Sequence, residues 1–229
     1  MRDSKLIYLS YTLNRNSPTY GNRNRFKIEK KSSIKRGDIA NDSSISTTVH
    51  IGTHIDMPYH FFEDGQSIED FPASFWRFYG DEILLLELKE IKDLVVEDEL
   101  IKELEKTEDK LNYKLLLVKT GACYIREKKE FWERNYGFSP KVAEYLRENF
   151  SNIRIFGFDS ISVSSFQNRM VGREAHRAFL NPKSPILLLE DMDLREVDEQ
   201  TIFKSITISP LRIEECDGLP CTIFGDIKL

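Results

Sequence analysis

The chain of 229 residues lacks the features that mark several protein classes. It has only three cysteines, Cys123, Cys216 and Cys221, and no Cys-x-x-Cys pair, so we expect neither a disulfide framework nor a zinc ribbon. No apolar run approaches the roughly 18 residues of a membrane span, and the N-terminus has no apolar core of signal-peptide length. We therefore expect a cytoplasmic protein with no membrane contact.

An excess of positive charge is also missing. The 33 lysines and arginines are outnumbered by 38 acidic residues, which gives a net charge of -5. The basic residues are interspersed with acids, as in "IREKKEFWER", so no unopposed basic stripe is formed. This pattern argues against a nucleic-acid partner. We expect a small-molecule substrate instead.

Several short apolar segments have the length and composition of buried strands: "EILLLEL", "KLLLVKTG", "NIRIFGFDSISV" and "PILLLED". Helical spacing is found in "VVEDELIKELEKTED", in "GREAHRAFL" and in "SPKVAEYLREN", where Ser139 and Pro140 have the residue types of a helix start. Strands outnumber helices and alternate with them only in the middle of the chain. This order predicts one mixed α/β domain over residues 1–229, not a regular doubly wound sheet.

Histidine is scarce, with four residues in the chain, yet three of them lie in "VHIGTHIDMPYHF" at 49–61. The spacing is His-x3-His-x-Asp-x3-His, made by His50, His54, Asp56 and His60. A helix would bring His50 and His54 together, but the glycine, the proline and the many β-branched residues of this stretch disfavour one. Apolar residues instead alternate with small or polar ones over 44–61, which predicts a strand.

A straight strand does not bring the polar side chains together. At about 3.3 Å per residue, His50 and Asp56 would lie roughly 20 Å apart, too far to share one ion. We therefore expect a bend at Gly52. Pro58 should end the strand pairing and redirect the chain, so that His60 faces the same site.

Two imidazoles and a carboxylate suit Zn²⁺, Mn²⁺ or Fe²⁺. Three protein ligands leave positions open for water, as in catalytic metal sites, and a bound ion shifts the pKa of its water towards neutrality. The alternative is a set of ordinary core or surface histidines. Three histidines sharing one face with an aspartate favour the metal site.

The stretch "HIGTHIDMPYH" resembles the signature His-x-Gly-Thr-His-x-Asp-x-Pro-x-His of the cyclase family of metal-dependent hydrolases, which includes kynurenine formamidase-like and isatin hydrolase-like enzymes. Most of the chain takes part in the resemblance, through "YLSYTL", "LLLVKTG", "FGFDSISV", "AHRAFL", "ILLLEDMDL" and the Asp-Gly-x-Pro of "ECDGLPC". It implies a swivelling β/β/α fold and a homodimer or homotetramer.

The resemblance also implies a set of metal ligands. His50, His54 and Asp56 would bind one divalent ion, Zn²⁺ first and Mn²⁺ second. In members with two ions, Asp56 would bridge to a second ion held by His176 and Glu190.

Two further residues receive roles from the same resemblance. His60 would be the general acid and base. Formamidases carry a substrate-contacting aromatic residue in a turn of the first loop, and Tyr20 in "NSPTYGN" occupies that place, although the proline between aromatic and glycine is missing.

The resulting hypothesis is hydrolysis of an amide C–N bond, in an aryl formamide such as N-formylkynurenine or in a cyclic amide. A second hypothesis keeps the metal and changes the reaction to a lyase, cyclase or dehydratase step on a small carbonyl compound. A third is a catalytically idle metal-binding protein. A histidine beyond the ligand set, His60, argues against the third.

Overall fold

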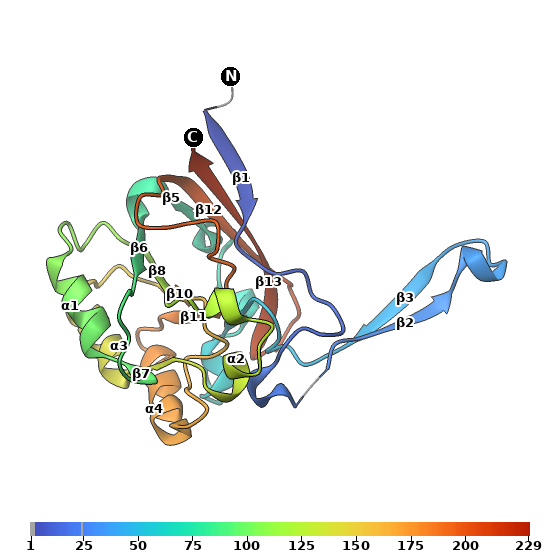
Figure 1. Ribbon diagram of the computed structural model, residues 1–229, viewed down its shortest axis with the longest axis horizontal. Helices are drawn as coiled ribbons and strands as arrows, with labels where there is room; N and C mark the ends of the chain where they lie inside the picture. The colour runs from blue at the N-terminus through green and yellow to red at the C-terminus, as the bar shows by residue number, and fades with distance from the viewer. Residues whose placement is uncertain (1–2, 24) are drawn as a thin grey trace.

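A nine-stranded mixed sheet is the centre of the computed structural model, which describes residues 3–23 and 25–229 (Figure 1). Eight of its strands run in the order β5-β12-β13-β4-β11-β10-β8-β6. The ninth, β1, pairs with β13 along residues 224–228, beyond the part of β13 that pairs with β4. One half of the sheet is parallel and the other half antiparallel. The short strand β4, His54–Asp56, joins the two halves because it pairs with both β11 and β13.

The parallel half consists of β6 (Ile83–Glu87), β8 (Leu115–Lys119), β10 (Ile155–Phe158) and β11 (Leu187–Glu190). Every residue of β8, β10 and β11 is buried. Strands covered on both faces need no polar alternation, which explains their continuous apolar sequences. All four strands confirm the predicted segments.

The helices are α1 (Asp98–Lys106), α2 (Glu130–Glu133), α3 (Pro140–Asn149) and α4 (Arg169–Phe179). Helices α1, α3 and α4 lie beside the parallel half, and α3 packs against both of the others (Figure 1). The Ser139 side chain accepts a hydrogen bond from the backbone N–H of Lys141, which confirms the predicted start of α3. The short helix expected over 172–180 begins earlier, at Arg169.

The antiparallel half contains β1 (Ser4–Tyr8), β4, β5 (Arg77–Tyr79), β12 (Phe203–Pro210) and β13 (Gly218–Lys228). Pairing of β1 with β13 places the described N-terminal end beside the C-terminus (Figure 1). Two small sheets lie outside the main one. They pair β7 (Val95–Val96) with β9 (Gly137–Phe138), and β2 (Lys27–Ser32) with β3 (Asp42–Ser46).

The hairpin β2–β3 forms an arm that projects from the rest of the molecule (Figure 1). Its strands pair only with each other, and Ile34, Ile39 and Ile45 on it are exposed. Nothing on the arm therefore contributes to the main apolar core.

The mixed α/β class is confirmed. The continuous strand predicted over 44–61 is wrong, because β3 ends at Ser46 and β4 begins only at His54. Residues 47–53 form an irregular bend between them. Among the residues that the structure describes, no helix has both the length and the hydropathy needed to cross a membrane.

Candidate metal centre

The bend in the histidine segment brings its polar side chains together. His50 lies in the bend, His54 and Asp56 lie on β4, and His60 lies in a short 3₁₀ turn, Pro58–His60. Gly52 has a φ of 59°, and a Cβ atom there would lie 2.4 Å from Leu13 Cδ2. Only glycine fits this position, which confirms the predicted reason for it.

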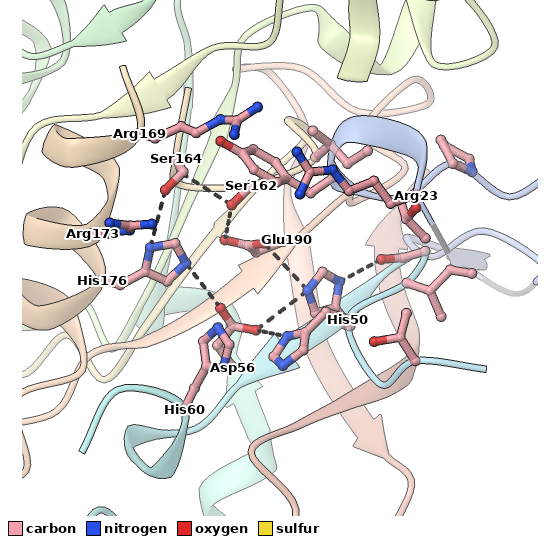
Figure 2. A pocket seen from close by; sticks show the side chains of 18 of the residues that line it. Arg23, His50, Asp56, His60, Ser162, Ser164, Arg169, Arg173, His176 and Glu190 are labelled. Carbon is pink, nitrogen blue, oxygen red and sulfur yellow. Dashed lines mark hydrogen bonds and ion pairs between the residues drawn. The ribbon is translucent and has the colours of Figure 1, made fainter. Parts of the chain in front are cut away.

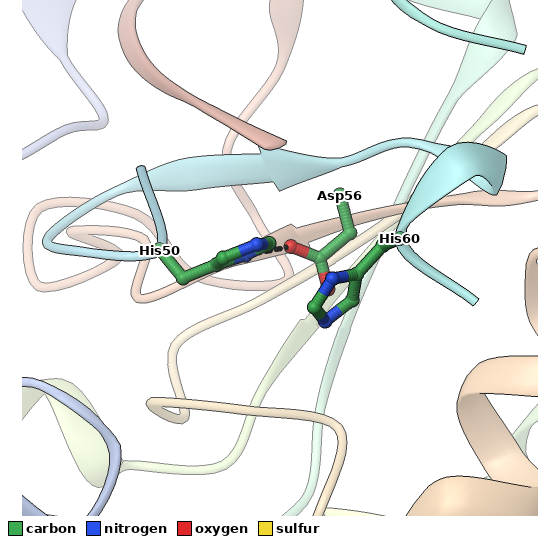
Figure 3. A group of neighbouring side chains, drawn as sticks. All are labelled: His50, Asp56 and His60. Carbon is green, nitrogen blue, oxygen red and sulfur yellow. Dashed lines mark hydrogen bonds and ion pairs between the residues drawn. The ribbon is translucent and has the colours of Figure 1, made fainter. Parts of the chain in front are cut away.

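Pro58 begins the turn that follows β4, as predicted. Figure 3 shows the result: His50 and His60 approach the Asp56 carboxylate from the two ends of the strand. Four side chains that a straight strand would spread apart therefore share one site.

Strand pairing and helix α4 bring two residues that are distant in the sequence to the same site. Glu190, the last residue of β11, is paired with His54 across the sheet. His54 Nε2 lies 3.4 Å from Glu190 Oε2 and 3.5 Å from Asp56 Oδ1. From α4, His176 Nε2 lies 3.5 Å from Asp56 Oδ2 (Figure 2). We call His54, Asp56, His176 and Glu190 the pocket floor; all four are buried.

Hydrogen bonds to the main chain orient the two histidines of the floor. His54 Nδ1 lies 2.8 Å from the carbonyl oxygen of Gly52, and His176 Nδ1 lies 2.8 Å from that of Gly172. A carbonyl oxygen only accepts, so each Nδ1 carries the hydrogen. In a neutral ring the Nε2 lone pair then faces a carboxylate, an arrangement that requires a cation between the two. Metal-binding histidines are commonly oriented in this way.

The spacing of these atoms suits a metal ion. Two ligand atoms that each lie about 2.1 Å from a tetrahedral ion are about 3.4 Å apart. The separations of 3.4 and 3.5 Å on the floor match that value and are longer than most hydrogen bonds. The donor set of imidazole and carboxylate suits Zn²⁺ or Mn²⁺. These residues therefore fit a divalent ion.

The charges of the pocket floor also favour a bound cation. Burial by itself would raise the pKa of Asp56, but the charge on His50, the neighbouring His176 ring and the hydrogen bond from His50 hold that pKa well below its usual range. Burial would lower the pKa of His54, and the neighbouring Glu190 and Asp56 carboxylates outweigh this and raise it. Two buried carboxylates thus draw positive charge into the floor.

Asp217, in the loop before β13, joins the site although the sequence analysis gave it no role. Its Oδ2 accepts hydrogen bonds from His50 Nε2 at 2.8 Å and from His60 Nδ1 at 2.9 Å. Those two hydrogen bonds hold the pKa of Asp217 below its usual range. The next residue, Gly218, permits the contact, because a Cβ there would lie 2.5 Å from His50 Cε1.

His50 is bound on both sides, since its Nδ1 also lies 2.8 Å from Asp56 Oδ1. Burial opposes a charge on this ring, but Asp56 and Asp217 outweigh burial and raise the pKa of His50 to about 10. The proton on Nδ1 occupies the place that a metal ion would take. His50 and His60 also lie close together, with ring centroids 4.1 Å apart.

One pocket of about 400 Å³ contains every predicted site residue (Figure 2). Its size is within the range of small-molecule sites. Tyr20 is part of the wall, where its hydroxyl donates to the carbonyl oxygen of Ser165 at 3.3 Å and its ring packs edge-on against Phe166 at 5.4 Å. Tyr20 is therefore placed in the pocket, while its contact with a substrate stays a prediction.

Comparison with known proteins agrees with this geometry. The family model described as putative cyclase matches residues 7–165. The chain belongs to the cyclase family. The kynurenine formamidase of Bacillus cereus is 26% identical to this cyclase-family protein over 220 residues, which cover 96% of each chain.

Two solved structures share the fold. Isatin hydrolase A from Labrenzia aggregata, bound to benzyl benzoate, gives a TM-score of 0.80 at 20% identity and covers 99% of this chain and 95% of its own. A protein from Bacillus stearothermophilus described as a predicted metal-dependent hydrolase gives a TM-score of 0.70 at 21% identity, covering 97% of this chain and 98% of its own. These similarities confirm the expected cyclase-family fold.

The possible ligand atoms of this family member form two groups. Possible ligand atoms of His54, Asp56 and Glu190 lie within 4.8 Å of one another, and so do those of His50, Asp56 and His60. Glu190 thus lies beside His54, and His60 lies beside His50 and Asp56. Asp56 belongs to both groups, as a bridging residue would. The division between one ion and two stays a prediction.

Proposed function

We propose that this protein is a metal-dependent hydrolase that cleaves the C–N bond of a small amide. The observation that carries the proposal is the pocket floor, where two oriented imidazoles face two buried carboxylates at metal-ligand spacing. The names of the relatives support it, since one is a formamidase and another hydrolyses isatin, a cyclic amide. An aryl formamide or a cyclic amide is the proposed substrate type.

The proposed ligands are His50, His54, Asp56, His176 and Glu190, and the ion is Zn²⁺ or, second, Mn²⁺. When bound, such an ion polarises a carbonyl group and makes water a stronger nucleophile near neutral pH. The carboxylates of Asp56 and Glu190 balance its charge. Because the floor is buried, each ligand is held in place before a substrate arrives.

His60 is the proposed general acid and base. Its Nδ1 donates to Asp217, so Nε2 is free to accept a proton from the attacking water and to deliver one to the leaving nitrogen. Imidazole suits both transfers because its ordinary pKa is near neutrality. The Asp217 carboxylate accepts the Nδ1 hydrogen and so fixes the tautomer and the orientation of the ring, as the aspartate does in a Ser-His-Asp triad.

Hydrolysis can be tested with the metal-loaded protein in H₂¹⁸O, with formanilide and isatin as substrates. We expect one solvent oxygen in the acid product and loss of turnover after chelation. A product without solvent oxygen would instead identify a lyase or cyclase. Bound metal without turnover of any small amide would favour the idle metal-binding protein.

We also propose that the protein is a homodimer or homotetramer. The β2–β3 arm supports this, because an isolated two-stranded hairpin is only marginally stable in water and this one exposes three isoleucines. A second copy of the chain would cover them. Sedimentation of the wild type and of Ile39→Lys tests the proposal: the wild type should sediment as an oligomer and the variant should dissociate.

A further inference from the structure

Three arginines surround the mouth of the pocket. Arg23 precedes the arm, and Arg169 and Arg173 lie on α4 (Figure 2). We call these three residues the arginine mouth. Arg169, Arg173 and His176 follow one another at spacings of four and three, so they lie on one face of α4. The same helix face therefore carries one residue of the floor and two of the mouth.

The charges of the arginine mouth are not neutralised by acidic neighbours. Among residues 3–23 and 25–229, the arginines that form ion pairs with carboxylates are Arg36, Arg126 and Arg195. Arg126 shows what a neutralised arginine looks like here, with two hydrogen bonds of 2.7 Å to Asp191. By contrast, Arg169 donates to the carbonyl oxygen of Phe166, and its guanidinium lies 4.0 Å from the centre of the Phe166 ring.

Within the described part of the chain, the acidic residues that line the pocket belong to its floor and not to the arginine mouth. The acidic residues that line it are Asp56 and Glu190, and both belong to the floor, where histidines face them. A divalent ion would balance these two carboxylates, and the Asp217 carboxylate is paired with His50 and His60, so the three guanidinium charges stay in excess. The whole chain carries a net charge of -5, so the pocket differs in sign from the rest of the molecule. Such a pocket attracts anions and repels cations.

We propose that the substrate carries an oxyanion, a carboxylate or a phosphate, and no ammonium group. This inference rests on the proposed hydrolase function and narrows its substrate class. Guanidinium groups bind both oxyanions through paired, charge-assisted hydrogen bonds. An α-amino acid such as N-formylkynurenine is disfavoured, because its ammonium group would meet three positive charges and no acid.

A series of formanilides with one scissile bond and different charge tests the inference. We would compare kcat/KM for unsubstituted formanilide, the three formamidobenzoates, 4-formamidophenyl phosphate and 4-formamidobenzylamine. At least one anionic substrate should exceed formanilide by about tenfold, the effect of one charge-assisted hydrogen bond, and the benzylamine should be poorer. The benzoates and the phosphate separate the two oxyanions. Equal values across the series would overturn the inference.

Substitution of each arginine tests whether the arginine mouth causes the preference for anionic substrates. Arg173→Gln, Arg169→Gln and Arg23→Gln should each lower the ratio of kcat/KM for the best anion over that for formanilide, with about a tenfold loss for the strongest. Arg36→Gln is the matched control, because it removes the same charge from the distant arm. An unchanged ratio in all three mouth variants would contradict the inference.

Binding of benzenesulfonate, an anion that is a poor metal ligand, separates this inference from the proposed reaction. Calorimetry on the protein as purified should show binding that weakens in the mouth variants and not in Arg36→Gln. If this holds while no formamide is hydrolysed, the anion site stands and the proposed reaction is wrong. If formanilide is hydrolysed but arginine-dependent anion binding is absent, the anion site is wrong and the reaction stands.

Discussion

The floor and the mouth of the pocket are built in different ways. On the floor, His54 and His176 are buried and each has one ring nitrogen bonded to a backbone carbonyl. At the mouth, the arginines are exposed and no carboxylate pairs with them within the described part of the chain. A buried floor with oriented imidazoles can hold one ligand geometry for the reaction. An exposed, unpaired mouth can change its partners, so it can select among substrates without disturbing the reaction.

The largest effect should come from the floor. We expect His54→Ala to lose both bound metal and measurable hydrolysis, because the substitution removes a central ligand and the imidazole that faces Glu190 Oε2. Tyr59→Ala is the control, since Tyr59 lies in the same segment but is exposed. Elemental analysis and turnover decide the outcome. Full activity in a metal-free variant would end the account.

His60 connects the floor to the substrate, and its loss should be smaller. We expect His60→Ala to keep its metal while kcat falls by about 10²–10⁴-fold, the usual range for a lost general acid and base. Metal content and kcat are measured on the same sample. If the variant loses its metal, His60 is a ligand, as its place beside His50 and Asp56 allows.

Asp217 should act through the two histidines that it orients. Asp217→Asn cannot stabilise a positive ring, so we expect kcat to fall by about 10–100-fold, a typical effect of losing a residue that positions a ligand. Asp226→Asn on β13 controls for the charge change. Addition of Asp217→Asn to His60→Ala should cost little further kcat if Asp217 acts mainly through His60. Additive losses would assign its effect to His50 instead.

The smallest effect should be at the mouth. Tyr20→Ala removes an aromatic ring from the pocket lining, so we expect a two- to tenfold rise in KM, about the free energy of one aromatic pair between Tyr20 and an aryl substrate. Metal content should stay at the wild-type level, with Tyr59→Ala again as the control. A loss of metal in Tyr20→Ala would show that floor and mouth are not independent.

The sequence indicated the histidine segment 49–61 better than it indicated the arginine mouth. His50, His54, Asp56 and His60 are local in the chain, and a glycine and a proline mark where it must turn. The prediction of a continuous strand over 44–61 was wrong, because the alternation of apolar and polar residues continues through 47–53 although no strand forms there. Pairing depends on which strands lie on either side, and the local pattern contains no such information.

Asp217 and the arginine mouth were missed for a related reason. Asp217 lies 157 residues from His60, and only the pairing of β13 with β4 brings it to the site. The helix expected over 172–180 did not include Arg169, so the sequence did not show that Arg169, Arg173 and His176 share one face of α4. A role for these arginines could be inferred only once the pocket was known, because exposed arginines on a helix are common and usually solvated.

Metal dependence of amide hydrolysis tests the central claim most directly. Purified protein would be analysed for bound metal, stripped with a chelator and reloaded with Zn²⁺ or Mn²⁺, with formanilide and formamidobenzoate turnover followed at each step. We expect turnover to disappear with the metal and to return in proportion to the metal bound, and we expect His54→Ala neither to bind metal nor to regain turnover on reloading. Turnover that persists unchanged in the stripped protein would contradict the claim.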